Sequence, residues 1–333
     1  MRLLVTGAAG FTGSHLCQRL LARGDAVTGL DNFDPFYDRA TKLGNLDHVR
    51  ASGRAGPAGP TGGFSFFEGD IRNPGDLTRA FTAAAPDLVV HLAALAGVRP
   101  SINEPARYSD VNLTGTQRLL DACAAHSVHR LAFASSSSVY GLDSAVPFSE
   151  ADTCLHPVSP YAATKRAGEL LCFTAHHLTG LGVTNLRFFT VYGPRQRPDL
   201  AIHKFTRLIA AGQPIELFGD GTTSRDYTFI DDIVDGCVAA IDQLASDLEG
   251  RFRTYNLGGS QTTTLRELVD LVSRTLGREA RITWSPEQPG DMKRTLANLQ
   301  HPGRELGYRP RVPIDEGIRR FVEWFLSTSP FRA

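Results

Sequence analysis

The sequence predicts an α/β protein with a doubly wound parallel sheet, and two observations support this prediction. Short apolar runs alternate with amphipathic stretches in the first half of the chain, and a glycine-rich turn directly follows the first run. The runs lie at residues 3–6, 26–31, 65–70, 87–92, 131–135 and 184–189. Such alternation implies a parallel sheet covered by helices on both faces. Because crossovers between parallel strands are right-handed, we expect the sheet to be doubly wound.

Helical periodicity identifies the elements between these runs. Apolar residues recur at helical spacing over residues 14–24, 114–126 and 161–174, and Gly24 is placed to cap the first helix. Residues 51–63 are rich in Gly, Pro and Ala and have no apolar period, so we expect an exposed loop there. After residue 190 the pattern is less regular. We expect a smaller α/β region there, with the chain returning to the main sheet at about residues 226–258.

The composition is that of an ordinary globular protein. The chain has 333 residues, of which 42% are hydrophobic and 21% are charged. Lys plus Arg and Asp plus Glu both number 35, so no net charge attracts the chain to nucleic acid or to an anionic membrane. No apolar run approaches the ~20 residues that span a bilayer, and the first residues lack the apolar core of a signal peptide. We therefore expect neither nucleic acid nor membrane as a partner.

The five cysteines carry no metal-binding spacing. Cys17, Cys123, Cys154, Cys172 and Cys237 are scattered and include no C-x-x-C pair. An odd number of such residues is typical of reduced thiols in a cytoplasmic protein, several of them buried. A metal site is the alternative, which the scatter disfavours. We expect a cytoplasmic protein without a metal.

The glycine turn T-G-A-A-G-F-T-G at residues 6–13 opens the first expected helix. The spacing of Gly7, Gly10 and Gly13 is a variant of the dinucleotide-binding fingerprint, in which glycines let backbone N–H groups approach a pyrophosphate at a helix N-terminus. Asp31 ends the second run, 18 residues after Gly13. An acid there accepts hydrogen bonds from the ribose hydroxyls and repels a 2′-phosphate, which favours NAD over NADP. The alternative is a purely structural strand–helix turn.

Asp70 and Ile71 follow the third run. They could flank the adenine of the cofactor, and an ordinary turn after a strand explains them equally well.

Tyr161 and Lys165 are four residues apart, so a helix places both side chains on one face. A free tyrosine, with a pKa of ~10, is a poor base near neutral pH. A neighbouring ammonium group and a bound nicotinamide cation would both lower this pKa, and the phenolate could then remove a proton from a sugar hydroxyl. The pair is common by chance. It gains weight because it follows both the glycine turn and the serine row A-S-S-S-S-V-Y-G at residues 134–141.

Together these motifs resemble those of the extended short-chain dehydrogenases/reductases, in the nucleotide-sugar epimerase/dehydratase group. The matching segments include D-N at 31–32, G-D-I at 69–71, H-L-A-A at 91–94, Y-A-A-T-K at 161–165, R-F-F-T-V-Y-G-P at 187–194 and S-R-D-Y-T-F-I-D-D at 224–232. The resemblance covers nearly the whole chain and implies a Rossmann domain over residues 1–190, completed by about 226–258. It implies a nucleotide-sugar-binding domain over 191–333, mainly 191–225 and 259–333.

The resemblance also assigns roles. It implies that NAD stays bound through the catalytic cycle, that Ser136 bonds the sugar hydroxyl beside Tyr161, and that Lys165 holds the nicotinamide ribose. Further cofactor contacts are implied for a set drawn from the matching motifs: Phe11, Asn32, Asp70, Ile71, Leu92, Ala93, Ala94 and Phe188. Relatives of this group form dimers through two helices of the cofactor domain, so a homodimer is expected.

The serine row distinguishes between chemistries within the group. The 4,6-dehydratases resemble S-T-D-E-V-Y-G at this place, where Asp and Glu eliminate water, and decarboxylases tend to carry Ser-Glu. Here the corresponding pair is Ser137 and Ser138, so both carboxylic acids are absent. The segments 31–38, 92–102, 188–201, 218–236 and 288–292 are similar to those of UDP-glucuronate 4-epimerases.

A uronic acid oxidised at carbon 4 is a β-keto acid and readily loses carbon dioxide, so its epimerase must hold the carboxylate firmly. A row of hydroxyls supplies donors without repelling that carboxylate. By family position, Thr190 and Arg197 complete this cradle, with a charge-assisted bond from the arginine. Arg225 and Arg99 are the candidates for the diphosphate, and Asp291 for the nucleotide ribose. The alternative is a polar strand end in which only Ser136 acts.

The expected reaction is therefore epimerisation of UDP-glucuronate at carbon 4 by retained NAD. Three alternatives stay open at this point. One is epimerisation of UDP-glucose or UDP-N-acetylglucosamine, another is decarboxylation of UDP-glucuronate, and the third is a non-catalytic NAD sensor.

Overall fold

The computed structural model describes residues 1–54, 63–286 and 292–328. Asp291 and residues 55–62 therefore lie outside the described residues, and most of the loop expected at 51–63 falls there. Residues 51–54 correct that expectation, because they form the last turn of a helix. Alanine and arginine favour the helix, and the first proline of the segment comes only at Pro57.

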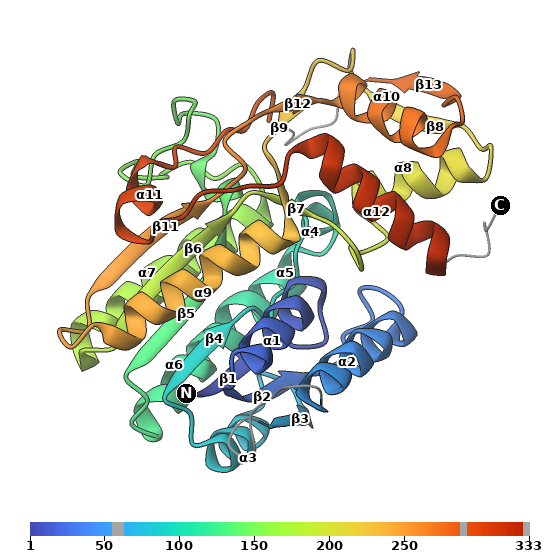
Figure 1. Cartoon of the computed structure of the whole chain (residues 1–333). Coiled ribbons are helices and arrows are strands. Elements are labelled where there is room, and N and C mark those ends of the chain that lie inside the picture. The colour runs from blue at the N-terminus through green and yellow to red at the C-terminus, as the bar shows by residue number, and fades with distance from the viewer. Residues whose placement is uncertain (55–62, 287–291, 329–333) are drawn as a thin grey trace.

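The described strands and helices alternate as expected, and Figure 1 labels most of them. The strands are β1 (Arg2–Thr6), β2 (Ala26–Asp31), β3 (Phe64–Glu68), β4 (Leu88–His91), β5 (Arg130–Ser136), β6 (Gly182–Phe188), β7 (Thr190–Tyr192), β8 (Ile215–Phe218), β9 (Ser224–Arg225), β10 (Tyr227–Phe229), β11 (Phe252–Leu257), β12 (Thr263–Thr264) and β13 (Ile282–Ser285). The helices are α1 (Phe11–Ala22), α2 (Arg39–Arg54), α3 (Pro74–Ala84), α4 (Val98–Asn103), α5 (Pro105–Ser109), the π-helix η1 (Asp110–Thr114), α6 (Gly115–Ala125), the 3₁₀-helix η2 (Ser137–Tyr140), α7 (Pro160–Thr179), α8 (Ala201–Ala210), α9 (Ile230–Ser246), α10 (Leu265–Leu276), α11 (Gln300–Glu305) and α12 (Ile314–Thr328).

A seven-stranded parallel sheet forms the centre of the molecule, in the order β11-β6-β5-β4-β1-β2-β3. All six predicted strands belong to it, so the doubly wound fold is confirmed. The chain winds outward in one direction from β1 through β2 to β3, and in the other direction from β4 to β11. In such a sheet, ligands bind at the carboxyl ends of the strands where the direction of winding reverses, which here is between β1 and β4.

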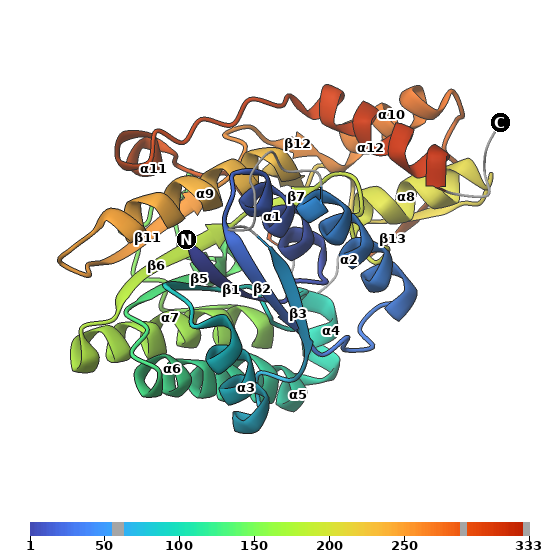
Figure 2. The same cartoon turned by 60° about the horizontal axis from the view of Figure 1, so that its bottom comes forward.

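Helices cover both faces of the sheet. Figure 2 shows α1, α2 and α9 on one side and α3, α6 and α7 on the other. Successive side chains of β1 point to opposite faces of the sheet and so reach both helical layers. Leu3 and Val5 pack into the apolar core with α1 and α9, whereas Leu4 packs into the core with α3 and α6. The first helix ends as expected, with Gly24 following its last turn at a φ of 91°.

The chain beyond β6 builds small pairs of strands and several helices. β7 pairs with β10, β9 with β12 and β8 with β13. Figure 1 shows α8, α10 and α12 grouped with β8 and β13, beyond the end of the sheet from which the chain leaves β4 toward α4. After α9 the chain returns to the large sheet as β11, directly beside β6.

Candidate functional site

A cavity of about 460 Å³ lies at the carboxyl ends of the sheet strands. Residues from the turns after β1, β2, β3 and β4 line it, together with residues from the end of β5, from α7 and from the segments around β7 and β9. It brings together most of the residues singled out from the sequence. These are Gly7, Gly10, Phe11, Gly13, Asp31, Asn32, Asp70, Ile71, Leu92, Ala93, Ala94, Ser136, Ser137, Ser138, Tyr161, Lys165, Phe188, Thr190, Arg197 and Arg225.

Two expected site residues are not in this set. Asp291 lies outside the described residues. Arg99, at the start of α4, is not among the described residues that line the cavity, and its guanidinium lies 4.6 Å from the centre of the Phe218 ring. The structure thus packs Arg99 against an aromatic side chain at the end of β8.

The glycine turn has the close packing that a dinucleotide site requires. Gly7 has a φ of 72°, and a Cβ atom on it would lie 2.8 Å from the Ala93 nitrogen. A Cβ on Gly13 would lie 2.1 Å from the Gly7 carbonyl oxygen, so no side chain fits there. The turn leads directly into α1, whose first N–H groups have no partners within the helix. Tyr37 also lines the cavity, and its buried hydroxyl has no hydrogen-bond partner among the described residues. The residues present therefore fit a pyrophosphate-containing cofactor.

Asp31 is held in place by backbone donors. Its two carboxylate oxygens accept hydrogen bonds from the N–H of Ala9 at 3.1 Å and of Phe33 at 2.9 Å. Burial raises the pKa of Asp31, while the charge of Lys42 and the two backbone bonds act in the opposite direction. Each oxygen keeps acceptor capacity, so the carboxylate can still receive hydrogen bonds from two ribose hydroxyls.

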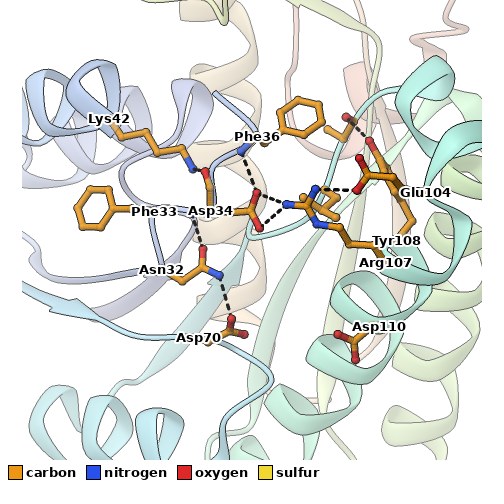
Figure 3. Close-up of polar contacts among 12 residues, drawn as sticks. Asn32, Phe33, Asp34, Phe36, Lys42, Asp70, Glu104, Arg107, Tyr108 and Asp110 are labelled. Atoms are coloured by element: carbon orange, nitrogen blue, oxygen red, sulfur yellow. Dashed lines mark hydrogen bonds and ion pairs between the residues drawn. The ribbon is translucent and has the colours of Figure 1, made fainter. Parts of the chain in front are cut away.

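Asn32 and Asp70 join the turns after β2 and β3. The Asn32 amide donates to Asp70 at 2.9 Å, and Figure 3 shows this contact at the edge of the cavity. The Arg72 guanidinium donates to both oxygens of Asp70 and holds the pKa of that carboxyl at about 2. Asp70 is therefore charged, and its position is fixed by neighbours rather than by the strand alone.

Tyr161, Lys165 and Ser136 meet where β5 ends beside the first turns of α7. Lys165 is 5% exposed, and its ammonium donates to the Ala134 carbonyl oxygen at 2.7 Å. Burial lowers the pKa of Lys165 to about 8. Burial also raises the pKa of Tyr161, against the opposing effects of a hydrogen bond with Ser136 and of the charge of Arg197. In the protein alone, burial dominates and the Lys165 ammonium is turned toward a backbone carbonyl, so the lowering of the Tyr161 pKa by Lys165 together with a bound nicotinamide stays a prediction.

The serine row lines the cavity, and several of its hydroxyls also form hydrogen bonds within the protein. Ser135 donates at 2.6 Å to Glu169, which forms a bidentate ion pair with Arg187. Ser136 caps η2 by accepting from the Ser138 N–H at 3.1 Å, and the two hydroxyl oxygens lie 3.2 Å apart. The hydroxyl of Ser135 therefore links β5 to α7, and all four residues from Ser135 to Ser138 line the cavity.

Arg197 reaches the cavity from the segment after β7, which also carries Thr190. Its Nε and Nη2 donate to the carboxylate of Asp199 at 3.1 and 3.0 Å, and its guanidinium lies 5.0 Å from the centre of the Phe36 ring. Among the described residues, no hydrogen-bond partner is found for Nη1. Asp199 thus orients the guanidinium and leaves one edge of it for another acceptor.

Several residues of this site were not found from the sequence. Asp34, Phe36, Tyr37 and Lys42 all line the cavity. Their segment, D-N-F-D-P-F-Y-D, was noted only for its family resemblance. Lys42 donates to the Asp34 carbonyl oxygen at 2.8 Å, a contact that helical periodicity does not reveal. Asp199 was also missed, because only Arg197 in its segment was assigned a role in the site.

The remaining sequence expectations concern metal, thiols and membrane. Within residues 1–54, 63–286 and 292–328, no group of three His, Cys, Asp or Glu side chains could hold a metal ion. All five cysteines are free and buried, as expected for several of them. A search of the described helices finds none that combines the length and apolar character of a membrane-spanning segment.

The fold and the meeting of Tyr161, Lys165 and Ser136 beside a glycine turn are those of a short-chain dehydrogenase/reductase. The chain belongs to the NAD dependent epimerase/dehydratase family, whose model matches residues 3–258.

Individual relatives are similar over nearly the whole chain. UDP-glucuronate 4-epimerase 3 of Arabidopsis thaliana is 41% identical over 337 residues, which cover 97% of this chain and 76% of the relative. The probable UDP-glucuronate 4-epimerase of Rhizobium meliloti (strain 1021) is 38% identical and is matched over 98% of this chain and 97% of its own length. The crystal structure of UDP-glucuronic acid 4-epimerase from Bacillus cereus, in complex with UDP-glucuronic acid and NAD, superimposes with a TM-score of 0.90 at 35% identity, covering 99% of this chain and 100% of that one.

Proposed function

We propose that this chain is a UDP-glucuronate 4-epimerase, which interconverts UDP-glucuronate and UDP-galacturonate with tightly bound NAD. One observation carries the choice of substrate: Ser136, Ser137 and Ser138 line the same cavity as Thr190 and Arg197. Hydroxyl groups and one guanidinium suit a sugar carboxylate, and the places of the dehydratase and decarboxylase acids are occupied by serines. The names of the relatives and the ligands of the Bacillus cereus structure support this choice.

The chemistry at carbon 4 is assigned to three residues. Tyr161 removes the proton from the hydroxyl on carbon 4, and Ser136 orients that hydroxyl. NAD supplies the hydride acceptor and donor, so the sugar is oxidised and then reduced on its other face with no net redox change. Because burial raises the pKa of Tyr161 in the protein alone, positive charge at the site is needed to favour its phenolate form. The ammonium of Lys165, with a pKa of about 8, is charged at neutral pH and serves to hold the ribose.

The proposed site must prevent the loss of the substrate carboxylate as carbon dioxide. Oxidation of carbon 4 produces a β-keto acid, which readily loses carbon dioxide. Donors from the serine row and from Arg197 would hold the carboxylate in place. The absence of an acid at positions 137 and 138 also avoids repulsion of the substrate. We assign Arg225, which lines the cavity from β9, to the diphosphate.

We further propose a division of labour along the chain. Residues 1–190, completed by about 226–258, bind NAD, and residues 191–225 and 259–333 bind the nucleotide sugar. The lining of the cavity supports this division. The glycine turn lines it from the proposed NAD-binding residues, and Arg197, Arg225 and Thr295 line it from the proposed sugar-binding residues.

We propose that the working form is a homodimer in the cytoplasm. On α7, Leu170, Phe173 and Leu178 expose 52%, 50% and 73% of their surface, which is unusual for large apolar side chains close together on one helix. Five buried free thiols suit a reducing compartment. Light scattering should give a dimer mass for the wild-type protein and a lower mass for Phe173→Glu. A monomeric wild-type protein would contradict the proposal, and fractionation of cells tests the compartment.

The reaction itself is tested by incubating the purified protein with UDP-glucuronate, without added NAD, and following products by proton NMR. UDP-galacturonate should appear and reach a constant ratio. UDP-xylose or a 4-keto pentose would indicate a decarboxylase. Conversion of UDP-glucose with no reaction of UDP-glucuronate would show that the serine row does not bind a carboxylate.

A further inference from the structure

An ion pair connects two segments that border the cofactor end of the cavity. Arg107, on α5, donates through Nη2 to both carboxylate oxygens of Asp34, at 2.7 and 2.9 Å, and the two residues are 73 positions apart. Figure 3 shows the two side chains pointing toward one another, Asp34 from the loop after β2 and Arg107 from a helix after β4. The other terminal nitrogen of Arg107 donates to Glu104 within the same segment at 2.7 Å.

The Asp34–Arg107 ion pair bridges segments that follow strands on opposite sides of β1. β2 lies on one side of β1, whereas α5 follows β4 on the other side. The pair therefore spans the point where the winding direction reverses, which is where dinucleotides bind in doubly wound sheets. Both connected segments also contribute to the cavity wall, through Asp34 itself and through Val111, which follows α5 in η1.

The loop that carries Asp34 has hydrogen bonds of its own, so the ion pair attaches an already ordered loop to α5. Asp34 accepts from the Phe36 N–H at 3.0 Å, and its carbonyl oxygen accepts from the buried Lys42. At the other end of the loop, Asn32 is bonded to Asp70. Breaking the bond to Arg107 would thus release the loop from α5 without removing its own contacts.

The strength of the pair is that of a partly buried contact. The side chains of Asp34 and Arg107 are 18% and 36% exposed. Both carboxylate oxygens accept from the same nitrogen, Nη2, and the pair is partly buried, so we expect its strength to lie at the upper end of the range for surface ion pairs. Because both side chains still contact solvent, salt should screen the pair.

We infer that the Asp34–Arg107 ion pair closes the cofactor end of the cavity and slows the release of NAD. The inference rests on the proposed function, in which NAD stays bound while the sugar is oxidised and reduced. Asp34 and Arg107 act as positioning residues, since they hold two cavity walls together rather than contact the reacting atoms.

The experiment measures NAD release from the full-length holoenzyme. Protein loaded with NAD is diluted into an excess of an NAD-dependent dehydrogenase with its substrate, and the fluorescence of the NADH formed reports each released molecule. Arg107→Met and Asp34→Asn should each release NAD about fivefold faster, which corresponds to ~1 kcal/mol. The double variant should be no faster than either single variant, because both changes break the same contact.

Glu104→Gln is the matched control. It removes the negative charge of the other partner of Arg107 but leaves the bond to Asp34, so NAD release should keep the wild-type rate. Raising the salt concentration to about 0.5 M should accelerate release from the wild type more than from Arg107→Met, because the variant lacks the pair that salt screens.

Three results would overturn the inference: wild-type release rates in both single variants, additive effects in the double variant, or an equal acceleration by Glu104→Gln. These results are distinct from a failure of the proposed function. A protein that binds no NAD, or that holds NAD and converts no UDP-glucuronate, would contradict the proposed function, whereas the ion pair is tested on NAD release alone.

Discussion

Replacing Arg197 with methionine should lower kcat/KM for UDP-glucuronate while leaving any kcat/KM for UDP-glucose, whose sugar has no carboxylate, unchanged. The magnitude follows from the geometry of the guanidinium. Nε and Nη2 are already bonded to Asp199, which leaves Nη1 to donate to the carboxylate of the substrate. One charge-assisted hydrogen bond contributes about 1.5–3 kcal/mol, so kcat/KM should fall roughly 10- to 150-fold.

The assay compares initial rates of both sugars in the wild type and in three variants. Arg197→Met alone leaves the carboxylate of Asp199 without its partner, and that carboxylate would repel the acidic substrate. The double variant Arg197→Met with Asp199→Asn removes this repulsion and should recover part of the loss. Asp199→Asn alone tests whether the guanidinium needs its carboxylate partner to stay oriented.

The reasoning would be refuted by an equal loss for both sugars, which would indicate a general role of Arg197 in folding or in diphosphate binding. An unchanged kcat/KM for UDP-glucuronate would refute it as well, because the carboxylate would then be held by hydroxyls alone.

Three further variants, and one control in α2, test the base, the cofactor end and the core. Tyr161→Phe should reduce kcat by about 10²–10⁴-fold with unchanged NAD content, and a rate within tenfold of the wild type would exclude Tyr161 as the base. Gly13→Ala should yield protein without NAD, because its Cβ would meet the Gly7 carbonyl oxygen at 2.1 Å. Full NAD content in this variant would contradict the packing argument. Gly44→Ala is the control: its Cβ would have no atom within 4 Å, so it should stabilise α2 by about 0.5–1 kcal/mol. His91 is 1% exposed, and burial lowers its pKa to about 3. Between this value and its unfolded pKa of ~6.5, only the unfolded chain gains a proton, so the free energy of unfolding decreases as the pH is lowered. At pH 5 this loss is about 2 kcal/mol, and urea unfolding at pH 7 and pH 5 should show a smaller fall for His91→Asn than for the wild type; equal falls would contradict the assignment.

The parts of the site that were predictable from the sequence share one physical basis. Asp31, Ser136 and the glycine turn all follow the ends of parallel strands, and such ends meet at one edge of the sheet. Motifs that are far apart in the chain were therefore placed together by the fold class alone, and the cavity contains them. Tyr161 and Lys165 could be added because helical spacing puts both on one face.

Contacts between side chains of distant segments could not be predicted in this way. Nothing in a single sequence pairs Asp34 with Arg107, since the two lie on segments whose distance depends on loop conformation. The bond from Ser135 to Glu169 is similar, because it depends on how α7 is rotated against β5. The direction of the Tyr161 pKa in the protein alone was unpredictable for a related reason, because it depends on burial and on where the Lys165 ammonium points.

The return of the chain to the large sheet has an evolutionary consequence. The chain leaves the sheet at the end of β6 and re-enters it as β11, the neighbouring strand. Residues 190–229, which include Arg197 and Arg225, lie between these two strands away from the large sheet, and α9 then leads back along the sheet to β11. Substitutions within residues 190–229 can reshape one wall of the cavity while the register of the large sheet is retained. A single cofactor scaffold can thus acquire new sugar preferences through local changes, without a new connection between domains.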